Sequence, residues 1–200
     1  MFFTVCSITS SGQKLKYRGF SGGMMIHSGY VSSESYSLIN STGDLVSRHN
    51  MHGTPFGIGG SIKIHLSDHF RLGSEGYVST LSYDNNGSFA SVGWGGILAD
   101  RIWQLDKIAP FIGICIGGGS FKNLTLNSNY GDDYIVESNL SYRKYSFMAV
   151  TPFVGMEYAI TDKVRLVFKA DYLMNVSNFQ KDFLRGIRLF AGFSFYRLKD

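Results

Sequence analysis

The segment Val164–Tyr172 reads VRLVFKADY, with apolar residues at every even position and charged residues at three of its four odd positions. Successive side chains of a β-strand point to opposite sides, so a period of two indicates a strand whose faces meet different surroundings. Met174 continues the apolar stripe. This segment therefore predicts an amphipathic β-strand.

The same alternation recurs along the chain and predicts eight strands. Apolar stripes occupy even positions in the first seven segments and odd positions in the last. The segments are 20–30, 56–66, 70–78, 90–98, 108–116, 148–158, 164–174 and 187–195. In the fourth segment the stripe consists of Ala90, Val92, Trp94 and Leu98.

The connections between these segments alternate in length. The short connections are 67–69, 100–107 and 161–163, and the longer ones are 32–53, 120–144 and 175–186. Asn86-Gly87 is a strong hairpin signal between the third and fourth strands. Bacterial membrane barrels join their strands by short inner turns and longer outer loops. An even number of strands would place both termini on the periplasmic side.

Composition supports a single all-β domain. Of the 200 residues, 17% are charged, 15% are aromatic and 24 are glycine, a combination that suits closely packed strands better than helices. The uncharged stretch 108–121 is too short for a transmembrane helix. Any membrane crossing must therefore use strands.

Other classes of protein fit less well. The net charge of +4 is not gathered into a basic patch, which argues against nucleic-acid binding. Cys6 and Cys115 have no metal-type spacing. His49 and His52, with Asp44 nearby, lack a third ligand at defined spacing, so no metal and no cofactor is expected.

The polar stripes carry charges of both signs among glycine, serine and threonine residues. A soluble barrel would cover its outside with charges, whereas a narrow membrane barrel encloses small and polar residues. We therefore expect these charges inside, as paired structural groups, with Glu157 opposite Arg165. The alternative is that they line an ion path. The expected lumen charges are Lys63, Glu75, Glu157, Arg165, Lys169, Asp171 and Arg188.

The pattern resembles the small eight-stranded bacterial outer-membrane β-barrels of the OmpA and OmpX type. The resemblance covers residues 18–197 and includes an aromatic-rich last strand, LFAGFSFY at 189–196. It implies an all-β, eight-stranded antiparallel up-and-down transmembrane β-barrel in the outer membrane of a Gram-negative bacterium. Members of this group serve as anchors, as binding surfaces or as lipid-modifying enzymes, so the fold does not choose among these roles.

The N-terminal residues differ from the rest of the chain. The apolar run 1–8 is followed by Ser10-Ser11-Gly12, which is typical of the end of an export signal. We expect cleavage before Gln13. The predicted division is a signal-peptide remnant and lead-in over 1–17 and the β-barrel domain over 18–200.

The sequence predicts a non-enzymatic, monomeric protein that contacts outer-membrane lipid and presents loops 32–53 and 120–144 to an extracellular ligand or protein. The first alternative is a lipid-modifying barrel enzyme, for which His65 and Ser67 supply a base and a nucleophile without a clear acid partner. We assign no catalytic residue. The second alternative is a soluble barrel that binds an apolar ligand.

Overall fold

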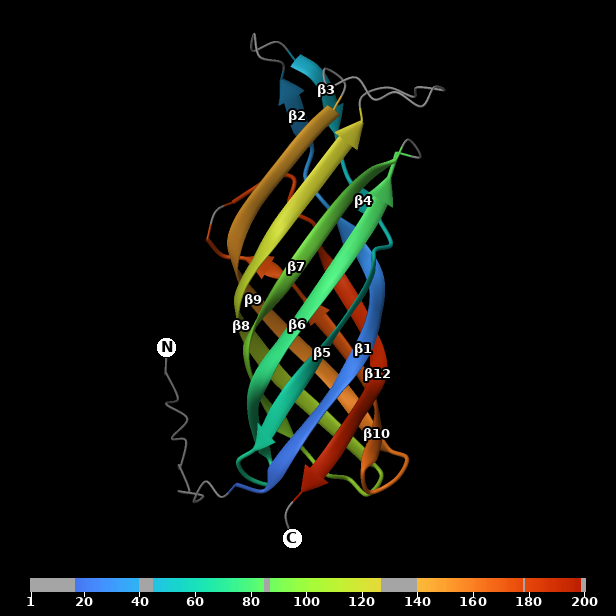
Figure 1. Cartoon of the computed structure of the whole chain (residues 1–200), viewed down its shortest axis with the longest axis vertical. Helices are drawn as coiled ribbons and strands as arrows, with labels where there is room; N and C mark the ends of the chain where they lie inside the picture. The colour runs from blue at the N-terminus through green and yellow to red at the C-terminus, as the bar shows by residue number, and fades with distance from the viewer. Residues whose placement is uncertain (1–16, 40–44, 85–86, 127–139, 178, 199–200) are drawn as a thin grey trace, which may run out of the picture.

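The computed structural model describes residues 17–39, 45–84, 87–126, 140–177 and 179–198. Eight long antiparallel strands form a closed barrel, because β12 pairs with β1 and β9 pairs with β10 (Figure 1). This confirms the all-β, up-and-down barrel. The strands are β1 (Gly19–Ser32), β5 (Phe56–His65), β6 (Phe70–Tyr83), β7 (Ser88–Ile102), β8 (Ile108–Leu126), β9 (Leu140–Ala159), β10 (Val164–Tyr172) and β12 (Arg185–Leu198).

Four short strands accompany the eight long ones. β2 (Tyr36–Ile39) and β3 (Leu45–His49) form a hairpin, β4 (His52–Gly53) pairs with β1, and β11 (Met174–Asn175) pairs with β9. β8 and β9 stay paired as far as Leu126 opposite Leu140, so much of the expected loop 120–144 is strand. Residues 127–139 within it lie outside the described residues.

The two ends of the barrel differ. The start of β1 and the end of β12 lie at the same end as the turns that join β5 to β6 and β9 to β10, and the β2–β3 hairpin lies at the other end, which we call the outer end (Figure 1). The expected turn 100–107 is shorter than predicted, because β7 continues to Ile102 and includes Asp100. The expected signal remnant 1–17 lies outside the described residues except for Tyr17.

The barrel is inside-out relative to a soluble protein. Apolar side chains cover its outer wall, with Ile26, Ile58 and Ile116 all at least half exposed, while most of the charged residues on the strands are buried in the lumen. Exposing such a surface to water would be costly, so the wall faces lipid and the barrel spans a membrane. Among the described residues there is no helix long and apolar enough to cross a membrane.

The face predicted for the fourth strand is wrong. Ile97 is 67% exposed, whereas the four apolar residues expected to face lipid are buried in the lumen. They are Ala90, Val92, Trp94 and Leu98. Residues directly opposite each other share a face of the sheet, and the register pairs Thr80 with Ser91. The β6–β7 connection therefore shifts the pattern by one residue, which moves the whole stripe to the other face.

Candidate functional site

The half of the lumen nearer the turn between β5 and β6 holds a buried ion-pair cluster. Arg71 donates hydrogen bonds from Nε and Nη2 to the Asp100 carboxylate at 2.6 and 2.8 Å. Its Nη1 lies 2.6 Å from Glu157 Oε1 and 2.8 Å from the Tyr196 hydroxyl. Lys63 Nζ donates to Asp100 Oδ2 at 2.7 Å. Four buried charges thus neutralise one another across the barrel.

The register positions this cluster. Arg71 on β6 lies directly opposite Asp100 on β7, and Glu157 reaches Arg71 from β9 on the far side of the lumen. Tyr196, on β12, donates its hydroxyl hydrogen to the Glu157 carboxylate. Because each carboxylate has cationic and hydrogen-bonding partners, the cost of removing these charges from water is offset.

A second cluster lies next along the lumen, toward the outer end. Lys169 Nζ is 2.9 Å from Glu75 Oε2, 3.6 Å from Asp171 Oδ2 and 3.3 Å from the Tyr77 hydroxyl. The same ammonium lies 4.3 Å from the centre of the Phe190 ring. Aromatic faces attract cations in water-poor surroundings, so this lysine is held by both charge and ring contacts.

Arg188 lies beyond these two clusters and is bound differently. It is directly opposite Asp171 in the β10–β12 register, yet among the described residues it forms no salt bridge, and its guanidinium lies 5.0 Å from the centre of the Trp94 ring. Its Nη2 donates to the Leu184 carbonyl at 3.4 Å. His27 packs beside it against Trp94, with ring centres 5.4 Å apart. This layer is aromatic and polar, not ion-paired.

Between the two ion-paired clusters the lumen has little free space. A cavity between the two ion-paired clusters, bordered by Lys63, Glu75 and Lys169, holds about 10 Å³, which is room for about one water molecule. Nearer the outer end, the connection between β11 and β12 packs onto lumen-facing side chains: Phe183 is 1% exposed and its ring lies 4.9 Å from that of Phe147. We call residues 179–184 the outer lid.

A buried carboxylate anchors the outer lid. Asp182 is fully buried, accepts a hydrogen bond from the Tyr145 hydroxyl at 3.3 Å and lies 3.4 Å from Arg143 Nη1. Burial raises the pKa of the Asp182 carboxyl above its usual value, although the Arg143 charge opposes the shift. The outer lid is therefore held to β9 through Asp182, whose protonation state depends on pH.

The structure changes the expected pairing of Glu157. The register places Arg165 opposite Ala159, and Glu157 opposite Val167, so the expectation that Glu157 and Arg165 face each other directly is wrong. The hairpin turn is centred about one residue later than predicted. The two side chains still meet diagonally, with Arg165 Nη1 3.5 Å from Glu157 Oε2.

Six of the seven lumen charges that the sequence singled out are buried in the barrel and Arg165 is partly buried, but two central members were missed. Arg71 and Asp100 are 0% and 2% exposed. The alternation had put Arg71 on the polar face of its strand, whereas Asp100 had been assigned to a turn. Their opposition across β6 and β7 could have been found only if the hairpin register had been known.

His65 and Ser67, the described residues considered for catalysis, have different hydrogen-bond partners. His65 Nε2 lies 2.9 Å from Ser21 Oγ, whereas Ser67 Oγ accepts hydrogen bonds from the His69 and Phe70 amides. Asp44 lies outside the described residues. Within the described part of the chain, no group of three or more histidine, cysteine or acidic residues could hold a metal ion.

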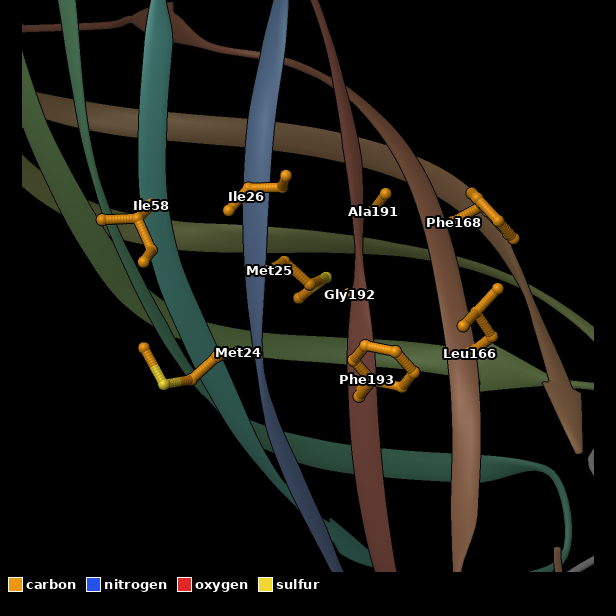
Figure 2. A pocket seen from close by; sticks show the side chains of 9 residues that line it. All are labelled: Met24, Met25, Ile26, Ile58, Leu166, Phe168, Ala191, Gly192 and Phe193. Atoms are coloured by element: carbon orange, nitrogen blue, oxygen red, sulfur yellow. The ribbon is translucent and has the colours of Figure 1, made fainter. Parts of the chain in front are cut away.

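The outer wall contains a shallow apolar groove of about 360 Å³ between β5, β1, β12 and β10. Figure 2 shows Met24, Ile26, Ile58, Phe168 and Phe193 among the side chains that line it, with Gly192 on β12. It belongs to the lipid-facing surface. Its lining offers packing area and no functional polar group.

Comparison with known proteins supports the fold. No family model matches the sequence, and no curated protein matches it. Neisserial surface protein A is similar in structure, with a TM-score of 0.60 at 13% identity over 91% of this chain and 99% of that one. Ail of Yersinia pestis, solved with the heparin analogue sucrose octasulfate, gives 0.55 at 8% identity over 90% and 99%.

These structural likenesses point to the same fold as the inverted distribution of apolar and charged residues does. The chain is a membrane-spanning eight-stranded barrel with the fold of bacterial outer-membrane proteins.

Proposed function

We propose that this protein is a closed outer-membrane scaffold whose role is structural or surface-binding and is carried by its extracellular end. One observation carries the proposal: the lumen is filled by mutually neutralising charges around Arg71 and is covered by the outer lid. A barrel of eight strands has little more space than its own side chains need. The inward charges then stabilise the interior and do not guide ions.

The outer end supplies the surface for such a role. The β2–β3 hairpin lies at this end (Figure 1), and the β8–β9 pair continues to Leu126 and Leu140. Exposed polar and aromatic groups there include Tyr142 and Arg143. Loops held on a rigid barrel are suited to binding because the scaffold fixes their position.

Two measurements test the proposal: the conductance of the purified protein and the mass of outer-membrane lipid. Purified protein in planar bilayers should give no steady conductance, since we expect the charge cluster around Arg71 and the outer lid to block the lumen. Outer-membrane lipid extracted from cells that produce the protein should keep its mass. Steady conductance would favour a pore, and a change in lipid mass would favour the lipid-modifying alternative. Either result would contradict the closed scaffold.

A further inference from the structure

Two lysines face each other on the outer wall of the barrel. Lys122 on β8 lies directly opposite Lys144 on β9, and both are exposed. Like charges in directly opposed positions destabilise a sheet. Among the described residues, neither ammonium has a carboxylate within salt-bridge distance. Within the described part of the chain, the fold therefore holds two positive charges side by side on its lipid-facing side with no paired carboxylate.

This pair lies at the depth of lipid headgroups. On β9 the exposed Tyr142 lies nearest the outer end, and the unbroken run of outward apolar residues ends at Met148, which is 57% exposed. Lys144 lies between them, four residues nearer the outer end than Met148. At about 3.3 Å per residue and a tilt of about 40°, it lies about 10 Å above the apolar belt. Flexible lysine side chains can reach down from there to the membrane interface.

Hydroxyl groups lie beside and below the two lysines on the same face. Ser91 is directly opposite Lys122, and its hydroxyl lies 3.5 Å from that of Thr80. One step down the barrel, Ser120 is directly opposite Ser146. Cationic and hydroxyl donors thus converge on one outward patch, with the chemistry that recognises a phosphate group.

Below the hydroxyl groups the wall is flat. Gly93 lies opposite Ser120, and Gly118 lies opposite Met148. A Cβ atom added at Gly93 or Gly118 would come no closer than 3.9 or 3.4 Å to any neighbour, so barrel packing does not require glycine there. A smooth strip directly beneath a cationic patch leaves room for hydrocarbon chains against the wall.

We propose that Lys122 and Lys144 clamp a phosphate group of an anionic outer-leaflet lipid, whose acyl chains lie against the strip around Gly93 and Gly118. The lipid phosphate compensates the repulsion that the register imposes on the two lysines. The flat strip brings the chains close to the wall. This inference rests on the barrel spanning the membrane and is independent of the role of its loops.

The test compares lysine variants for binding of diphosphoryl lipid A by native mass spectrometry in a zwitterionic detergent. Lys122→Gln and Lys144→Gln should each weaken binding about five-fold, the fold-change that corresponds to about 1 kcal/mol per basic residue at an anionic surface. Lys181→Gln, which removes an exposed outer-lid lysine, is the matched control and should bind like the wild type.

Three further measurements distinguish a lipid phosphate from free phosphate and test the contact of the acyl chains with the strip. Dephosphorylated lipid A should bind the wild type as weakly as diphosphoryl lipid A binds the double lysine variant. Inorganic phosphate alone should not compete at millimolar concentration; full competition would identify free phosphate as the ligand and overturn the lipid proposal. Gly118→Val should weaken lipid binding without lowering the thermal midpoint of the lipid-free barrel.

Lipid-free stability provides the last check. Without lipid, the double lysine variant should unfold at the same temperature as the wild type or higher, since the repulsion is gone. A lower midpoint would show that the lysines stabilise the barrel itself. That result, or equal lipid binding by the wild type and the double variant, would refute the clamp.

Discussion

Arg71 lies directly opposite Asp100 across β6 and β7, and two of its nitrogens donate hydrogen bonds to that one carboxylate, at 2.6 and 2.8 Å. Such a two-point contact fixes orientation as well as distance. Because Glu157 receives a third bond from the same guanidinium, at 2.6 Å, Arg71 links three strands across the lumen.

Removing Arg71 should therefore be costly. Arg71→Met leaves Asp100 and Glu157 buried with fewer cations, and we expect a loss of about 3–5 kcal/mol in the free energy of unfolding. The measurement is urea unfolding in micelles. Arg18→Gln, which breaks the exposed pair with Asp68, should cost no more than about 1 kcal/mol. Equal effects of the two changes would contradict a structural role for the lumen cluster.

The orientation of β7 can be tested by fluorescence. With Trp103 replaced by phenylalanine, Trp94 should be insensitive to brominated lipid because it lies in the lumen. Replacing Trp94 as well and introducing Ile97→Trp should give strong quenching, since position 97 faces lipid. Quenching of Trp94 would show that the shifted register of β7 is wrong.

The outer lid should depend on its buried phenylalanine. Phe183→Ala removes contacts with the Phe147 and Phe121 rings, and about 3–5 kcal/mol is typical of such a change in a packed core. We expect faster tryptic cleavage at Lys181 while the barrel stays folded. Phe179→Ala, at a site that is 65% exposed, is the control and should leave the cleavage rate unchanged.

The lid should also loosen as the pH rises. The pKa of Asp182 is raised in the folded protein, so the folded lid holds this proton more tightly than the unfolded segment does. This contribution is full below the ordinary aspartate pKa and is lost as the pH rises through the folded value. Protection of Lys181 from a protease active at acid and neutral pH should fall accordingly. In Asp182→Asn the dependence should disappear.

Cysteine labelling tests the direction of insertion. In a Cys115→Ser background, a cysteine at Asn50, near the β2–β3 hairpin, should react with an impermeant maleimide on intact cells. A cysteine at Asp162, in the turn between β9 and β10, should react only after the outer membrane is opened. The reverse pattern would mean that the barrel is inserted with its turns outside.

The strand number, the antiparallel barrel fold and the outward face of most strands were predictable from the amino-acid sequence. Period-two alternation is a local property, so a segment such as Val164–Tyr172 shows its two faces without knowledge of its neighbours. The inversion of the faces was also readable, because charges of both signs recur on the stripe that is rich in small residues.

The register of the strands became known only from the three-dimensional structure. A shift of one residue reverses the faces of a whole strand, and the shift at the β6–β7 connection carried Trp94 into the lumen and Ile97 to the lipid. It also placed Arg71 opposite Asp100 and Lys122 opposite Lys144. Which charges meet depends on pairing between strands, because the partners are far apart along the chain and no local pattern encodes their alignment.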